Sequence, residues 1–151
     1  MFKRKIYSKM QEWKKNSNGK TALLIEGARR TGKSTAVEAF AKNEYQSYLL
    51  IELSRASKET KELFEDVSDL NYLFLQLQLQ YKIDLQERNS VIIFDEVQLC
   101  PAARQAIKAL VADHRYDYIE TGSLISIKRN VKDILIPSEE RKISMYPMDY
   151  E

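Results

Sequence analysis

The feature that most constrains this chain is a glycine-framed loop between an apolar run and a helix-like segment. The run TALLIE, residues 21–26, leads directly into GARRTGKST, which holds two of the four glycines in the chain. Residues 27–34 match the pattern G-x-x-x-x-G-K-[S/T] in full. Glycines permit turns that side chains would block, so the loop N–H groups can converge on an anion with a helix N-terminus behind them. The sequence therefore predicts a phosphate-binding loop.

Each position in this loop has an expected task. Lys33 would reach the β- and γ-phosphates of a nucleotide, and the Ser34 hydroxyl would bind Mg²⁺. The alternative is an ordinary turn with a solvated lysine, and the position between a strand and a helix argues against it. Arg29 and Arg30 either lie near the phosphates or are exposed loop arginines, and the second interpretation is favoured. The expected nucleotide-binding residues are Gly27, Ala28, Arg29, Arg30, Thr31, Gly32, Lys33, Ser34 and Thr35.

Apolar runs alternate with helix-like segments along the whole chain. The runs predict strands near residues 21–26, 48–53, 91–94, 116–120 and 143–146. Helices are expected near residues 1–18, 33–43, 57–87 and 101–113. The QLQLQ alternation within residues 70–85 also fits a strand, so both assignments stay open there.

This alternation predicts the fold class. Apolar strands separated by helices form a parallel sheet with helices on both faces. Right-handed crossovers place the loops that follow the strands along one edge, where ligands bind. We expect an α/β fold: a P-loop three-layer α/β/α sandwich with a mainly parallel five-stranded sheet, preceded by an N-terminal amphipathic helix. Residues 1–151 are expected to form one domain, with the helix at 1–18 and the nucleotide-binding core at 19–151.

The N-terminal segment combines an apolar face with positive charge. Phe2, Ile6, Met10 and Trp13 recur at helical spacing, and the first twenty residues hold seven Lys or Arg and one Glu. Such a helix can contact DNA, RNA or lipid, whereas the plainer interpretation is a solvated helix face. The net charge of the whole chain is only +2, so DNA is a weakly supported partner.

Cysteine content and hydropathy bear on location. Cys100 is the only cysteine, so no intrachain disulfide can form, which fits a reducing cytoplasm. The charged N-terminus lacks the apolar core of a signal peptide, and no apolar run approaches the roughly 20 residues that span a membrane. We expect a cytoplasmic protein with no membrane partner.

Two adjacent carboxylates follow the third apolar run, in SVIIFDEVQ. Their placement at the end of a buried strand costs free energy unless a cation or donors compensate. Mg²⁺ beside the phosphate loop would compensate, with Asp95 binding the metal directly or through water. Glu96 would orient a water and accept its proton as the water attacks the γ-phosphorus. The alternative is that both residues cap the following loop or helix.

Hydroxyl groups end the fourth strand, in YDYIETGSLIS. If the strands are ordered as in related P-loop sheets, Thr121 or Ser123 lies near Asp95 and can sense the γ-phosphate or orient the water. Ordinary hydrogen bonding at a strand end is an equal alternative. Gln98 could also face the nucleotide, but we expect it to be an exposed loop residue.

These residues favour one reaction over its alternatives. The chain lacks the Asn-Lys-x-Asp guanine-reading motif, so ATP is favoured over GTP. We expect Mg²⁺-dependent ATP hydrolysis coupled to conformational change, with Lys33, Glu96 and Thr121 as catalytic residues and Ser34 and Asp95 as metal ligands. The alternatives are a small-molecule or nucleoside kinase that uses the same loop, and a nucleotide-binding switch or interaction module that does not hydrolyse ATP.

The ordered set of motifs resembles a known family. GARRTGKST, IIFDEVQ, IETGSLIS and the closing YPMDYE are similar to segments of the prokaryotic AAA-type ATPases that carry a C-terminal domain of unknown function. The resemblance spans nearly all of the chain. It implies nucleotide contacts at the phosphate loop, metal and water roles for Asp95 and Glu96, and a sensor role for Thr121 or Ser123. It also implies work through a protein partner or a homo-oligomer.

Two departures from that family pattern affect these expectations. The closing YPMDYE has an extra Asp before its aromatic residue. Family members also continue into a further domain, so this chain, which stops at Glu151, is expected to be an ATPase core truncated at its C-terminus. An arginine finger can contribute roughly 10³–10⁵ in rate. Arg115, Arg129 and Arg141 are the candidates, with exposed surface positions as the default interpretation.

Overall fold

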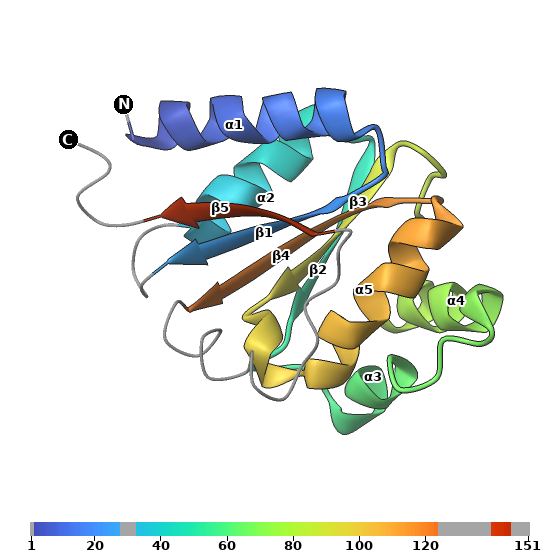
Figure 1. Ribbon diagram of the computed structural model, residues 1–151. Coiled ribbons are helices and arrows are strands. Elements are labelled where there is room, and N and C mark those ends of the chain that lie inside the picture. Colours follow the sequence, from blue (N-terminus) through green and yellow to red (C-terminus); the bar gives the residue numbers. More distant parts are fainter. Residues whose placement is uncertain (1, 28–32, 124–139, 146–151) are drawn as a thin grey trace.

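The computed structural model describes residues 2–27, 33–123 and 140–145, and its elements follow the predicted alternation (Figure 1). The strands are β1 (Ala22–Gly27), β2 (Ser47–Glu52), β3 (Ser90–Asp95), β4 (Asp117–Ser123) and β5 (Glu140–Met145). The helices are α1 (Phe2–Ser17), α2 (Lys33–Glu44), α3 (Lys58–Leu63), α4 (Leu70–Tyr81), the 3₁₀ turn η1 (Val97–Leu99) and α5 (Pro101–Asp113).

The five strands form one sheet in the order β2-β3-β4-β1-β5, and every neighbouring pair is parallel. The predicted five-stranded parallel sheet is therefore confirmed. Strand β1 lies between β4 and β5, with Gly27 level with Ser123 and Met145. On the other side of β4, strand β3 ends at Asp95. The carboxyl ends of β1, β3 and β4 thus meet along one edge of the sheet, as the sequence predicted.

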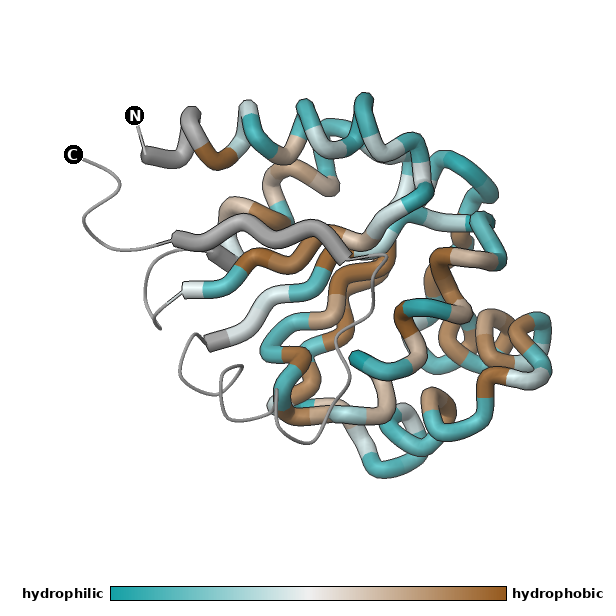
Figure 2. The backbone as a smooth tube through the Cα atoms, viewed as in Figure 1, coloured by the Kyte–Doolittle hydropathy of each residue, from teal (hydrophilic) through white to brown (hydrophobic). Residues whose placement is uncertain are grey.

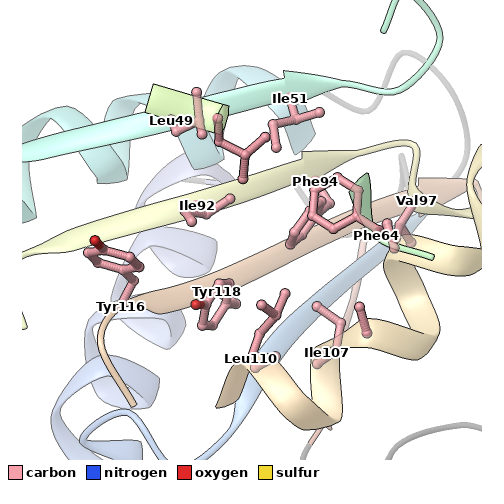
Figure 3. Packing of buried hydrophobic residues seen from close by; sticks show 14 of the residues in the cluster. Leu49, Ile51, Phe64, Ile92, Phe94, Val97, Ile107, Leu110, Tyr116 and Tyr118 are labelled. Carbon is pink, nitrogen blue, oxygen red and sulfur yellow. The ribbon is translucent and has the colours of Figure 1, made fainter. Parts of the chain in front are cut away.

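Two apolar clusters cover the two faces of the sheet, because successive strand residues point to opposite sides. Leu23 and Ile25 of β1 pack with α1 and α2, whereas Ala22 and Leu24 belong to the cluster beneath α3, α4 and α5. Figure 2 shows the hydrophobic residues concentrated in the strands, and Figure 3 shows how β2, β3 and β4 face α5 in the second cluster. The three-layer α/β/α arrangement is confirmed.

Helix α1 packs against α2 through the apolar face that the sequence predicted. Ile6, Met10 and Trp13 are buried, and the ring of Tyr7 meets Phe40 of α2 edge-on at 5.5 Å. The side chain of the fourth predicted residue, Phe2, lies outside the described part of the structure. No helix in the described ranges has the length and apolarity that a bilayer crossing requires.

The segment predicted as helical over residues 57–87 forms two helices and an irregular connection. The strand alternative for residues 70–85 is wrong, because Leu73, Phe74 and Leu77 bury one helical face of α4. Asp69 caps this helix through its carboxylate, which accepts the N–H of Tyr72 at 3.1 Å. Lys82 adopts the left-handed conformation, with φ 53°, and ends it. The prediction was thus right in type for α3 and α4 and wrong for the residues between and after them.

Candidate functional site

The candidate site lies where the chain leaves β1 and β3, at the carboxyl edge of the sheet. Gly27 ends β1, and residues 33–44 form the helix that follows the phosphate-loop sequence. Residues 28–32 and the side chain of Lys33 lie outside the described part of the structure, so the predictions for them stay predictions. Ser34 and Thr35 are exposed in the first turn of α2. The expected order of strand, loop and helix is thus present around the loop.

Asp95 is the meeting point of two hydroxyl groups from distant parts of the chain. Its Oδ1 accepts a hydrogen bond from Ser34 Oγ at 2.6 Å and another from Thr121 Oγ1 at 2.6 Å. Short bonds of this kind are typical of hydroxyls that donate to an ionised carboxylate. The sequence predicted that Ser34, Asp95 and Thr121 act at one site, and the structure brings these three side chains together.

The chemistry of these donors suits a small divalent cation bound together with phosphate. Ser34 Oγ and the Asp95 carboxylate are hard oxygen ligands, as Mg²⁺ prefers, and the hydroxyl is exposed. No group of three or more His, Cys, Asp or Glu that could hold a metal occurs among the described residues. Mg²⁺ is usually held by one or two protein ligands together with water and substrate phosphates. Ser34 and Asp95 therefore fit a metal that arrives with a nucleotide.

Glu96 sits in a backbone conformation that few residues adopt. Its φ and ψ are 58° and 55°, in the left-handed region, at the point where β3 turns into η1. The conformation is unfavourable for a residue with a side chain, and it occurs often at functional sites. The Glu96 N–H donates to Thr121 Oγ1 at 3.0 Å, which anchors the turn to β4. The side chain of Glu96 is half-buried.

Thr121 connects the two carboxylate residues. Its hydroxyl donates to Asp95 and accepts from the Glu96 N–H, and the side chain is fully buried. One hydroxyl group thus bridges Asp95 and the backbone of Glu96. Ser123, the alternative sensor, lies at the end of β4 level with Gly27, and its side chain is outside the described part.

Gln98 corrects one prediction from the sequence. It is 7% exposed rather than an exposed loop residue, and its Nε2 donates to Glu96 Oε1 at 2.7 Å. The reason is the sharp turn at Glu96, which begins η1, packs Val97 into the core and brings Gln98 against the glutamate. The E-x-Q spacing was visible in the sequence, but its meaning depended on this turn. Gln98 is the functional candidate that sequence reasoning misjudged.

Of the three arginine candidates, Arg115 is the one whose side chain lies in the described part of the structure. Arg115 precedes β4 at the amino edge, where its Nε pairs with Asp113 at 3.1 Å and its guanidinium lies over the ring of Phe74. It is therefore engaged at the edge opposite to Asp95. Arg129 and the side chain of Arg141 lie outside the described part of the structure.

Comparisons with known proteins agree with this architecture. A family model described as an AAA domain matches residues 19–151. Among solved structures, PCH-2 of C. elegans is similar, with a TM-score of 0.51 and 16% sequence identity, over 94% of this chain. The match covers 42% of the PCH-2 chain, and at this identity it is evidence for a shared fold alone. A search of the curated proteins finds no match.

Proposed function

Because the chain belongs to the family of AAA domains, we propose that it binds ATP with Mg²⁺ at the carboxyl edge of the sheet and hydrolyses the γ-phosphate. The observation that carries the proposal is the convergence of Ser34 and Thr121 on one oxygen of Asp95. These residues come from the helix after the phosphate-loop sequence, from β4 and from β3. A structural carboxylate cap would not need a hydroxyl from each of these segments.

Binding would use the loop and the two metal ligands. The backbone of residues 27–35 would surround the phosphates, and Lys33 would neutralise charge on the β- and γ-phosphates. Ser34 Oγ and Asp95 would hold the metal, so the hydrogen bond between them would be exchanged for metal contacts. Bound Mg²⁺ would supply charge neutralisation on the phosphate oxygens.

Hydrolysis would depend on Glu96. A water in line with the γ-phosphorus would attack it, and the bond from phosphorus to the β–γ bridging oxygen would break with its electron pair leaving on ADP. Glu96 would accept the proton of that water. Gln98, which donates to Glu96 Oε1, would hold the carboxylate in position, and Thr121 would report the state of Asp95 to the Glu96 turn. This linkage is the proposed route from hydrolysis to conformational change.

The proposed assembly follows from the family rather than from a described surface. We propose action with a protein partner or as a homo-oligomer, in which a neighbouring chain could supply an arginine to the γ-phosphate. We also propose that residues 1–151 form a single domain and that the protein is cytoplasmic.

The test is Mg²⁺-dependent phosphate release from ATP, compared between the native chain, Glu96→Gln and Asp95→Asn. Glu96→Gln should lower turnover by about 10²–10⁴-fold and leave ATP binding intact, since its amide oxygen can still accept from Gln98. Asp95→Asn should weaken Mg²⁺-dependent binding itself. A fluorescent ATP analogue would report binding for each protein.

Other outcomes separate the alternatives. Phosphate transfer to an added nucleoside would indicate a kinase, and binding without turnover in the native chain would indicate a switch. The absence of ATP binding in the native chain would overturn the proposal.

A further inference from the structure

Strand β2 forms one outer edge of the sheet, far in strand order from the phosphate-loop strand (Figure 1). It pairs with β3 on one side, and on its other side no strand pairs with it in the described ranges. An unpaired edge presents backbone N–H and C=O groups that can bind another extended chain.

The register shows which backbone groups of β2 face outward. The N–H of Leu53 donates to the C=O of Asp95 at 3.1 Å, while Glu52 is level with Asp95. In a parallel ladder alternate residues bond to the same neighbour. Ser47, Leu49 and Ile51 therefore share the β3 side with Leu53. The N–H and C=O groups of Tyr48 and Leu50 point to the free edge, and no backbone hydrogen bond outside the ladder is made by them within the described part.

A cavity of about 460 Å³ runs along this edge. Residues 47–50 of β2 form its floor. Glu38 and Lys42 of α2 line one wall, and Tyr81 and Ile83, at and after the end of α4, line the other. The free backbone groups thus lie in a groove between two helical layers.

The edge also lacks the usual protection against strand addition. Natural edge strands are blunted by proline, by charged side chains (lysine above all), by bulges, by great shortness or by a covering helix or loop. The six residues of β2, SYLLIE, contain neither proline nor lysine, their one charged residue is the terminal Glu52, and they pair with β3 in unbroken register. An apolar edge left open at a groove is typical of a peptide-binding surface.

We propose that this groove binds an extended peptide segment of a partner protein as a sixth strand beside β2. Side chains of an added strand alternate between the two walls. Those on the α4 side would meet Tyr81 and Ile83, and should be apolar. Those on the α2 side would meet Lys42, which is exposed and has no ion pair within the described residues, and should be acidic. Glu38 already accepts the Tyr48 hydroxyl at 2.9 Å.

A second copy of the chain could also offer a strand to this edge. Its own β2, SYLLIE, carries one carboxylate, Glu52, at its end, and does not place an acidic side chain at every second position. The exposed Lys42 therefore favours an acidic partner peptide over a second copy.

The probe is a fluorescein-labelled seven-residue peptide of alternating valine and glutamate, and the readouts are fluorescence anisotropy and the amide signals of the full chain in NMR spectra. Binding should shift the amide signals of Tyr48 and Leu50 and slow their hydrogen exchange. Lys42→Glu with the original peptide, or the native chain with a valine–lysine peptide, should weaken binding by at least fivefold. Combining Lys42→Glu with the valine–lysine peptide should restore it. Leu50→Pro should weaken binding at least tenfold, because it removes one outward N–H, and Leu50→Val should not.

Two backbone-methylated peptides give a control that cannot unfold the protein. One carries N-methyl groups on the valines and the other on the glutamates. For one strand direction, only one of these sets of N–H groups can face β2, because a shift by one residue would turn glutamates toward Tyr81 and Ile83. One methylated peptide should therefore lose binding and the other keep it. Equal behaviour of the two, signal changes away from β2, or a dimer in sedimentation with no peptide binding would each overturn the proposal.

Discussion

The two edges of the sheet use similar groups for different ends. At the amino edge, Asp117 is 5% exposed and accepts hydrogen bonds from the Tyr45 hydroxyl and from Arg88, the latter at 2.9 Å. At the carboxyl edge, Asp95 is only half-buried and accepts hydroxyl groups from Ser34 and Thr121. The Asp117 carboxylate is buried and paired with the guanidinium of Arg88. The Asp95 carboxylate accepts the exposed hydroxyl of Ser34, and a metal ion could replace that contact. Burial and partner, rather than residue type, distinguish a structural carboxylate from a candidate ligand.

The amino edge is tied together by several chain segments. Arg88, which precedes β3, also donates to the C=O of His114 at 3.1 Å, and His114 Nε2 lies 3.0 Å from the C=O of Asn18. The turns after α1 and α5 are thus bound to the start of β3. In α/β folds the edge opposite the ligand site is where such fixed links can form without obstructing function. We infer that the amino edge carries stability and the carboxyl edge carries chemistry.

The most direct test of the difference between the two edges is to neutralise each aspartate in turn. Asp117→Asn should lower the free energy of unfolding by about 2–3 kcal/mol, less than for a fully buried pair, because the Arg88 side chain is 35% exposed. Asp95→Asn should change it by less than about 1 kcal/mol. Urea unfolding of both variants checks the difference. Equal losses would contradict the division between the edges.

The next effect concerns the turn that brings α1 to the amino edge. Gly19 has φ 82°, and a Cβ atom there would lie 2.5 Å from Arg88 Nη2 and 2.7 Å from His114 Nε2. Gly19→Ala should cost about 1–3 kcal/mol, because both the backbone and the contact are unfavourable. Asn18, at φ 48°, is the matched position, and Asn18→Gly should be nearly neutral or stabilising. The melting temperatures of both variants test this expectation. An unchanged melting temperature for Gly19→Ala would show that the Arg88 side chain moves to make room for the Cβ atom.

The fold could be predicted from the sequence because its strands are nearly all apolar. Residues 91–94 are all β-branched or aromatic, which favours a buried strand, and proline at 101 marks the first turn of α5, whose predicted bounds match the structure. The irregular segment around α3 and α4 could not be predicted, since QLQLQ fits two periods and the choice was made by the Asp69 cap and by burial of Phe74.

The site could be predicted only as far as residue type and strand order decide it. The contact between Thr121 and Asp95 follows from which strands are neighbours, and the sequence predicted that neighbourhood only on the condition that the strand order is that of related P-loop sheets. The burial of Gln98 depends on the left-handed conformation of Glu96, which is set by the tertiary structure and not by local preference. Backbone exceptions of this kind are where sequence reasoning fails.

The contact between Gln98 and Glu96 allows a smaller test at the carboxyl edge. Gln98→Leu should lower kcat about tenfold with KM and the free energy of unfolding little changed, because it removes the donor that orients the proposed base. The measurement is steady-state ATP hydrolysis beside urea unfolding. A parallel loss of stability would assign Gln98 to the core instead.

The last effect is a gradual loss of stability in alkali, and it belongs to the amino edge. Burial, with the negative charge of Asp117, raises the pKa of Tyr45 far above its ordinary value near 10, and burial also raises the pKa of Tyr118. Both phenols therefore stay protonated in the folded chain, while they ionise in the unfolded chain above pH 10. Their contribution to stability is complete below that pH and declines as the pH rises, by about 1.4 kcal/mol per pH unit for each tyrosine. Tyr45→Phe should reduce the slope of this decline between pH 10 and about 11.5 by about 1.4 kcal/mol per pH unit, which is the contribution of one tyrosine. Tyr72→Phe, at a 55% exposed position, is the matched control. An identical slope in both variants would show that Tyr45 does not contribute to the pH dependence of stability.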